Sequence, residues 1–314
     1  MSFSAAGTRD TLRPLSPPLV SIVTPSYNQA EFLEETIQSV LAQDYQPIEY
    51  IVLDGGSTDG SVDIIRTYSD RLAWWRSEPD RGQVDALNAG FESASGEILG
   101  WLCSDDTLLP GAVSCLVAEL ERHPEALIAY GHAVWTNERS EPIGNPRSRP
   151  WELRTMARGG GQHVAQPASL WRRRAWELAG PLDERFEYVF DTLFFLRMAA
   201  EGEGRLIDRP LATHRLHPRA KTRRTDVGKV DEHVRVAQDF YGGPLPPRLR
   251  SHARVGAANA YRRAAWTSYH AGDAGRARRL ALRSLVASPW MSRRTAAFVA
   301  RTLIPRRLLG WRGG

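Results

Sequence analysis

Four short polar runs that could bind a ligand each follow an apolar run typical of a buried strand. They are Thr24 to Asn28, Asp54 to Gly60, Glu78 to Gln83 and Ser104 to Asp106. Taken singly, each has the composition of an ordinary turn. The carboxyl ends of parallel strands, however, lie at one edge of a sheet, where such sheets bind their ligands. Three of the four runs contain a carboxylate, so we expect a binding site at that edge.

The adjacent acids Asp105 and Asp106 are the sharpest of these signals. They follow Ile98 to Cys103, an almost continuously apolar run, and neighbouring carboxylates repel each other unless a cation or a hydrogen-bond donor compensates. Carboxylate oxygens at a strand end suit Mg²⁺ or Mn²⁺ held jointly with substrate phosphates. The alternative is that one of the two acids only caps a helix that begins near Pro110.

Apolar runs and helical spacing alternate from residue 19 to residue 134. Strands are expected at Leu19 to Thr24, Ile48 to Leu53, Leu72 to Arg76, Glu97 to Cys103 and Ala126 to Val134. Helices are expected at Ala30 to Ala42, Ser57 to Tyr68, Gln83 to Ala94 and Pro110 to Arg122. This alternation predicts an α/β fold with a mostly parallel, Rossmann-like sheet covered by helices. Prolines and glycines predict a loop region from Thr136 to Gly161.

The composition is typical of a soluble globular chain. Of its 314 residues, 42% are hydrophobic and 25% are charged. No stretch reaches the ~18 uninterrupted apolar residues that a membrane span requires. The residues up to Pro18 lack the apolar core of a secretory signal. Two cysteines, Cys103 and Cys115, do not make a disulfide framework, which favours a cytoplasmic protein.

The charge is unevenly divided along the chain. Residues 241–314 hold 15 arginines and one acid, a net charge of +14, whereas the first 240 residues hold 26 basic and 35 acidic residues, a net charge of −9. This division predicts a main domain that ends at residue 240 and an Arg-rich helical region over 241–314. Pro14, Pro17 and Pro18 among small polar residues predict a flexible leader over residues 1–18, so that the main domain covers 19–240. The helices of that region are expected at Leu249 to His270, Ala274 to Val286 and Ser292 to Leu309.

An arginine-rich helical region beside an acidic body indicates an anionic partner, either a membrane surface or nucleic acid. Trp290 and Trp311 flank the last expected helix, as interfacial anchors often do. The membrane interpretation predicts peripheral contact with the anionic inner face of the plasma membrane. The alternative to membrane contact is a solvated basic face, in a chain that uses arginine for almost every surface cation.

A family resemblance rests on several motifs that occur in order. They are Ser21 to Asn28, Val52 to Ser61, Asp80 to Gly90, Gly96 to Asp106, Gln166 to Arg173 and Gly180 to Glu184. Together they resemble the family 2 inverting glycosyltransferases over roughly residues 19 to 225. The resemblance implies the glycosyltransferase A fold, a nucleotide-diphosphate-sugar donor, a divalent metal (Mn²⁺ or Mg²⁺) and inversion at the anomeric carbon.

The resemblance also implies roles by position. Six residues would line the donor pocket: Pro25, Tyr27 and Asp54 at the base and ribose, and Asp80, Gln83 and Asp85 around the nucleoside and donor. The run Ser104 to Asp106 resembles the family's Asp-x-Asp element with serine in first place. That departure leaves Asp106 as the metal ligand and Asp105 as a contact to ribose or the donor sugar.

Two later segments complete the site that the resemblance implies. Thr213 to His217 resembles the family's Arg-x-His element, with Arg215 as a diphosphate partner and His217 as a metal or diphosphate ligand. The segment after Glu187 resembles the one that carries the general base, and its remaining acid is Asp191. A base must take a proton from the acceptor hydroxyl, so a carboxylate is expected at the pocket mouth. The alternative role for Asp191 is a helix cap.

The implied function is the transfer of one sugar, with a UDP-sugar favoured as donor, to a glycan or lipid-linked acceptor in cell-surface polysaccharide synthesis. Two alternatives stay open. A sugar nucleotidyltransferase shares a related sheet, but Ser21 to Asn28 lacks the glycine-rich basic signature that it needs. A nucleic-acid-binding protein would use the arginine-rich end but would give four carboxylates no role, so no nucleic acid is expected as a partner. These carboxylates are Asp54, Asp105, Asp106 and Asp191.

Overall fold

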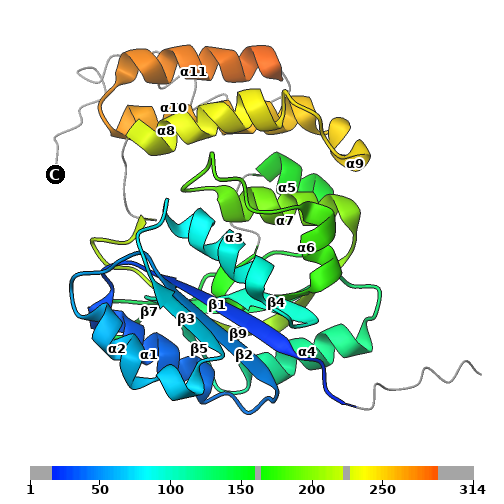
Figure 1. Ribbon diagram of the computed structural model, residues 1–314. Helices are drawn as coiled ribbons and strands as arrows, with labels where there is room; N and C mark the ends of the chain where they lie inside the picture. The colour runs from blue at the N-terminus through cyan, green and yellow to red at the C-terminus, as the bar shows by residue number, and fades with distance from the viewer. Residues whose placement is uncertain (1–15, 160–163, 222–226, 289–314) are drawn as a thin grey trace, which may run out of the picture.

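One mixed sheet runs through the computed structural model, which describes residues 16–159, 164–221 and 227–288 (Figure 1). Its strands lie in the order β3-β2-β1-β4-β8-β6-β9-β5, and β7 pairs with β6. The strands are β1 (Val20–Ser26), β2 (Ile48–Asp54), β3 (Trp74–Ser77), β4 (Ile98–Trp101), β5 (Thr107–Leu108), β6 (Ile128–Thr136), β7 (Pro142–Gly144), β8 (Ser169–Arg172) and β9 (Gly204–Arg215).

The first half of the sheet is parallel, as predicted. β1 pairs with β2 and β4, and β2 pairs with β3, all in parallel register. Alternate residues of β2 face opposite sides: Ile51 and Leu53 join one core cluster, and Tyr50 and Val52 join the other. Because both faces are buried, the strands have continuous apolar sequences. The predicted α/β fold is confirmed.

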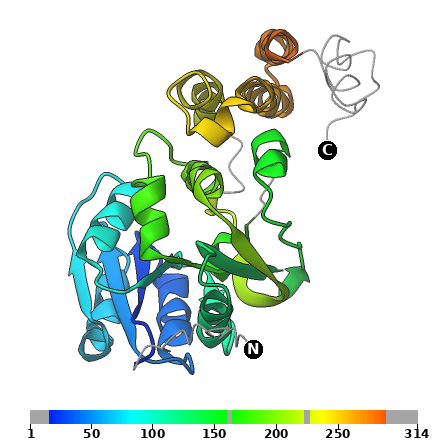
Figure 2. The same ribbon diagram turned by 90° about the vertical axis from the view of Figure 1, so that its right-hand side faces the viewer.

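Helices cover both faces of the sheet (Figures 1 and 2). The helices of one face are α1 (Ala30–Leu41), α2 (Ser61–Thr67) and α4 (Ala112–Arg122). Those of the other face are α3 (Gln83–Ser93), α5 (Leu153–Gly159), α6 (Arg173–Ala179) and α7 (Phe190–Glu201). On this second face, Trp171 is fully buried and packs edge-on against Trp101, with ring centroids 5.0 Å apart.

The second half of the sheet departs from the sequence prediction. β8 lies between β4 and β6 and runs antiparallel to both. The expected loop region from Thr136 to Gly161 contains β7 and α5. β8 and β7 are four and three residues long, which is too short for alternation or helical spacing to be recognised. β8 is stabilised by pairing with the distant strands β4 and β6, and β7 by pairing with the end of the preceding strand β6.

The helices after β9 form a further layer beyond α5 and α7 (Figures 1 and 2). The helices after β9 are α8 (Val227–Arg235), the π-helical turn η4 (Val236–Phe240), α9 (Pro247–Arg250), α10 (Ala253–His270) and α11 (Ala274–Ala287). Although α8 precedes the expected boundary at residue 240, Val230 shares a small core with Ala264 of α10 and Leu280 of α11. The expected helix from Ser292 to Leu309 lies outside the described residues, as do both flanking tryptophans.

Within the described ranges, no helix is both long and apolar enough to cross a membrane.

The burial of His233 in α8 leads us to predict that the fold loses stability in acid. Burial, and then the charges of Arg263 and Lys229, lower the pKa of His233 to about 3. Between the ordinary value of 6.5 and about 3, the unfolded chain binds a proton that the folded chain does not. The free energy of unfolding therefore decreases as the pH is lowered through this window, by up to about 1.4 kcal/mol per pH unit.

Urea unfolding from about pH 7 to about pH 4 measures this slope. We expect His233→Asn to flatten it, because asparagine does not titrate. The exposed His270 offers a matched control, and His270→Asn should leave the slope as in the wild type. An identical slope in the His233 variant would contradict the prediction.

Candidate active site

The pairing of β5 with β9 assembles the centre of the site. Thr107 of β5 lies opposite Thr213 of β9, and the Thr107 amide donates to the Thr213 hydroxyl at 3.1 Å. The end of β9 therefore lies against the two acids that follow β4. His217 Nε2 is 3.1 Å from Asp105 Oδ2. The predicted metal and diphosphate residues are thus brought together from opposite halves of the domain.

Asp106 is buried, with 1% of its surface exposed. Its Oδ1 accepts the backbone N–H of Arg215 at 2.9 Å, and its Oδ2 lies 3.3 Å from Nδ1 of His214. Burial raises the pKa of Asp106. Burial alone would lower the pKa of His214, but the charge of Asp106 outweighs it and raises the pKa to about 9. A charged imidazole therefore faces this carboxylate, and sequence reasoning missed it.

The residues around this pair fit a divalent metal ion. One ligand atom each of Cys103, Asp105 and Asp106 lies within 4.8 Å of the others. In His217, Nδ1 is buried and has no hydrogen-bond partner among the described groups. Burial, followed by the charges of Asp106 and Asp105, raises the pKa of the Cys103 thiol well above its ordinary value. Mg²⁺ and Mn²⁺ prefer oxygen ligands to sulfur, which leaves the two carboxylates and an imidazole.

Arg215 is fully engaged inside the protein. Its guanidinium donates to the backbone carbonyl of Asp105 at 2.9 Å and to the Ser140 hydroxyl at 2.9 Å, and it pairs with Glu35 at 2.5 Å. It also lies over the ring of Phe32, 4.7 Å from the centroid. These contacts favour a positioning role, in which Arg215 fixes the turn that carries the two acids. The predicted contact between Arg215 and the diphosphate stays a prediction.

The carboxylate of Asp54 connects the loop after β2 to the end of β3. Its buried carboxylate accepts the N–H of Ser57 at 2.8 Å and the hydroxyl of Ser77, at the end of β3, at 2.7 Å. This turn occupies the residues that were expected to start the next helix. The helix α2 begins at Ser61, so the predicted start at Ser57 is wrong.

The loops after β1, β2 and β3 lie next to one another. A Cβ atom on Gly55 would lie 2.9 Å from Asp80 Oδ2, so glycine is what lets these two loops approach so closely. Pro25 is buried within β1, and Tyr27 follows that strand with 62% of its surface exposed. Tyr27 is therefore available to a ligand at this edge.

The start of α3 meets the end of β4. The side chain amide of Gln83 donates to Cys103 Sγ at 3.2 Å. Asp85, in the first turn of the helix, pairs with Arg81 at 2.5 Å, and this hydrogen bond lowers the pKa of Asp85. All six residues predicted to line the donor pocket therefore lie on or beside the carboxyl ends of β1 to β4. What each of them binds stays a prediction.

Asp191 lies in the first turn of α7. Its Oδ1 accepts the N–H of Thr192 at 2.6 Å and lies 3.2 Å from the Thr192 hydroxyl. The helix has no side-chain cap at Val189, so the contacts of Asp191 do not favour the capping role. Burial raises the pKa of Asp191, and the charges of His214 and Arg263 partly oppose this effect.

The loop that leads to Asp191 is held by α8. The carboxylate of Glu232, with 2% exposed surface, accepts the N–H of Tyr188 at 2.7 Å and also that of Glu187. Glu187 in turn pairs with Lys221 at 3.1 Å. No local sequence signal identifies Glu232, because its partners lie more than 40 residues earlier in the chain.

Comparison with solved structures identifies the fold. Staphylococcus aureus TarS, residues 1–349 in complex with UDP-GlcNAc, superposes with a TM-score of 0.65 and 17% identity, over 89% of this chain and 83% of that one. The mannosyltransferase PcManGT from Pyrobaculum calidifontis, in complex with GDP-Man and Mn²⁺, gives 0.57 and 20%, over 92% and 81%. The chain therefore has the glycosyltransferase A fold.

Sequence comparison then gives the family. The family described as Glycosyl transferase family 2 matches residues 21–177. An uncharacterized glycosyltransferase of Mycobacterium tuberculosis is 36% identical over 191 residues, which are 59% of this chain and 70% of that protein. Chondroitin synthase of Pasteurella multocida is 27% identical over 228 residues, 71% of this chain and 23% of that one. The chain belongs to glycosyl transferase family 2. This membership argues against a sugar nucleotidyltransferase.

Proposed function

We propose that the chain is an inverting glycosyltransferase that moves a sugar from a nucleotide-diphosphate sugar, with a UDP-sugar favoured, to a hydroxyl of a glycan or lipid-linked oligosaccharide. The observation that carries the proposal is the cluster of Asp105, Asp106 and His217 at the carboxyl edge of the sheet in a family 2 chain. The complex of TarS with UDP-GlcNAc supports the donor class. Sequence similarity to chondroitin and hyaluronan synthases supports a role in polysaccharide synthesis.

In this proposal the donor lies along the loops after β1 to β4, where Pro25, Tyr27 and Asp54 contact the base and ribose. Asp80, Gln83 and Asp85 line the pocket around the nucleoside and the rest of the donor. Asp106 and His217 hold a Mn²⁺ or Mg²⁺ ion, and Asp105 contacts ribose or the donor sugar. When bound, the ion supplies positive charge to the diphosphate as it leaves. Arg215 keeps the turn at Asp105 in place through its contact with the backbone there.

Asp191 is the general base of the proposed reaction. Its carboxylate takes the proton of the acceptor hydroxyl while the hydroxyl oxygen bonds to the anomeric carbon and the bond to the diphosphate breaks. Attack from the face opposite the leaving group inverts the anomeric configuration. Burial raises the pKa of Asp191, which makes its carboxylate a stronger base than an exposed one.

The acceptor side of the proposal includes the membrane. The helix α11 contains four arginines and no acid between Ala274 and Ala287, which supports contact with an anionic surface. We propose that the enzyme works in the cytoplasm at the inner face of the plasma membrane, where a lipid-linked acceptor would be presented. The division into a leader over 1–18, a catalytic domain over 19–240 and a basic region over 241–314 is part of this proposal.

A transfer assay tests the proposed reaction. Purified protein is incubated with a panel of UDP-sugars and oligosaccharide acceptors, and the release of UDP is measured with Mn²⁺ or with EDTA. We expect release that requires both an acceptor and the metal. UDP release that is unchanged by every acceptor and by EDTA would contradict the proposal.

Glu232→Ala should lower kcat without weakening donor binding. The substitution removes the acceptor of the backbone N–H groups of Glu187 and Tyr188, and the loop that carries Asp191 loses its anchor. Misplacing a catalytic group by about 1 Å costs about 100-fold in rate, so we expect a fall in kcat of about 10- to 100-fold. Steady-state kinetics at saturating donor measures it.

Two variants distinguish this positioning role from general loss of stability. Glu232→Gln keeps one acceptor oxygen and should restore part of the rate. Glu201→Ala removes an exposed glutamate of α7 and should change neither kcat nor KM. If Glu232→Ala instead raises the KM for the donor at constant kcat, the role assigned to Glu232 is wrong.

A further inference from the structure

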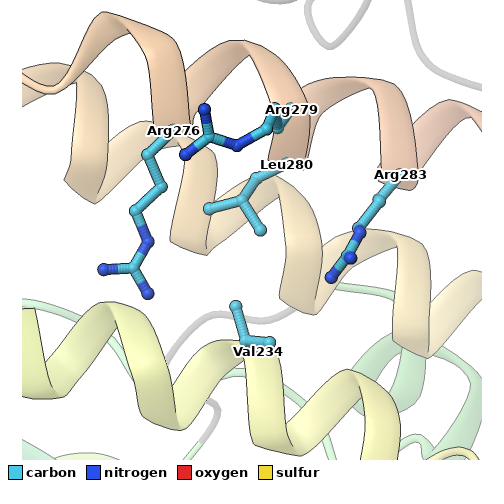
Figure 3. Close-up of a pocket in the computed structure, with 5 residues that line it drawn as sticks. All are labelled: Val234, Arg276, Arg279, Leu280 and Arg283. Atoms are coloured by element: carbon cyan, nitrogen blue, oxygen red, sulfur yellow. The ribbon is translucent and has the colours of Figure 1, made fainter.

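A groove with a volume of about 180 Å³ lies between α8 and α11 (Figure 3). Val234 of α8 and Leu280 of α11 form its apolar floor. Three arginines of α11, Arg276, Arg279 and Arg283, surround this floor. An apolar floor with a cationic rim suits a ligand that joins an anionic group to a hydrocarbon part.

Little negative charge balances these arginines. Arg276 pairs with Asp231 of α8, and the guanidinium of Arg283 lies 6.0 Å from the ring centroid of Tyr261. In the part of the chain that the structure describes, Arg279 has neither a hydrogen-bond nor an ion-pair partner. The helix α11 itself contains no acid. The groove therefore keeps a net positive charge that an anionic ligand can neutralise.

The outer face of α11 carries exposed apolar side chains. Its buried face consists of Ala277, Leu280, Ala281 and Ser284. On the opposite face, one turn apart, Leu282 is 49% exposed and Val286 is 81% exposed. At about 100° per residue, Arg278 lies on one side of this pair and Arg279 and Arg283 on the other. Exposed aliphatic side chains flanked by arginines are typical of helices that lie in a membrane interface.

We propose that α11, together with the groove between α8 and α11, forms a docking surface for an anionic lipid bilayer. The arginines of the rim bind lipid phosphates, and Leu282 and Val286 enter the interface between headgroups and acyl chains. This inference rests on the membrane contact proposed above and assigns it to particular residues. A nucleic acid could use the arginines but would leave Leu282 and Val286 in water.

Vesicle co-sedimentation of the full chain tests the docking surface. We expect binding to phosphatidylcholine vesicles that contain phosphatidylglycerol, and much weaker binding to phosphatidylcholine alone. Each arginine near an anionic surface contributes about fivefold in affinity, so Arg279→Gln/Arg283→Gln should weaken binding about 25-fold. Leu282→Asn/Val286→Asn should also weaken it. Arg66→Gln/Arg122→Gln removes the same charge from exposed positions of the main domain and should bind as the wild type does.

Wild-type affinity in either α11 variant would overturn the proposal, as would binding to duplex DNA that exceeds binding to the anionic vesicles. A melting temperature within the wild-type range shows that each variant is folded. Stabilisation by UDP and Mn²⁺ is measured on the same samples. If UDP stabilises the protein but vesicles do not bind, the membrane inference fails alone. If vesicles bind but no nucleotide does, the proposed glycosyl transfer fails alone.

Discussion

Asp191→Asn should abolish sugar transfer and leave donor binding intact. The amide keeps the size of the carboxylate, and its oxygen still accepts the Thr192 N–H that Asp191 accepts at 2.6 Å. It has no basic oxygen to take the acceptor proton. Loss of a general base lowers the rate about 100- to 10,000-fold, and we expect kcat to fall by a factor in this range. Initial rates of UDP release at saturating donor and acceptor measure the loss.

The pH profile of the wild type gives an independent readout of the same residue. Burial raises the pKa of Asp191 above the ordinary value of 3.8. The rate should therefore decrease as the pH is lowered through that raised pKa, because the carboxylate becomes protonated. As a matched control, Asp63→Asn replaces an exposed aspartate of α2 and should keep full activity. Transfer at the wild-type rate in Asp191→Asn would show that another group accepts the proton.

Asp106→Asn should abolish the response of the protein to metal. The amide oxygen still accepts the backbone N–H of Arg215, so the turn after β4 stays in place. The buried negative charge is lost, however, and an uncharged amide binds a divalent cation weakly. We expect transfer to fall by about 100- to 1,000-fold, the range found when one group that stabilises charge in a transition state, such as an oxyanion-hole donor, is removed. Mn²⁺ titration followed by thermal unfolding measures the metal response.

Asp105→Asn is the comparison variant for this prediction. Asp105 is assigned to ribose or the donor sugar, so its amide should weaken donor binding while the response to Mn²⁺ alone is kept. If Asp106→Asn retains the metal response and Asp105→Asn loses it, the assignments of the two acids are reversed. If both variants respond to metal as the wild type does, the metal site lies elsewhere.

The amino-terminal half of the fold could be predicted because its signals are local. β1, β2 and β4 are buried on both faces, so each is a continuous apolar run, and each parallel strand is followed by a helix with clear spacing. The polar loops then had to lie at one edge, because parallel strands end there. The pairing of Ser26 with Asp54 confirms that the first two strands end level with each other.

The remaining parts of the site depend on contacts between distant segments. His214 became visible as a site residue only when β9 paired with β5 and brought its ring to Asp106. Glu232 has no motif, since its role follows from the packing of α8 against the loop before α7. Arg215 was found by resemblance, but its ion pair with Glu35, 180 residues away, could not be read from the sequence.

Nucleotide-dependent stabilisation tests the central claim most directly. Thermal unfolding of the full chain is followed with UDP, GDP, CDP or dTDP, each in Mn²⁺, Mg²⁺ or EDTA. A ligand at ~100 times its Kd adds about 2.7 kcal/mol to the free energy of unfolding, which raises the melting temperature clearly. We predict that UDP stabilises the protein only when a divalent metal is present. If no nucleoside diphosphate raises the melting temperature with any metal, the chain does not bind the proposed class of donor.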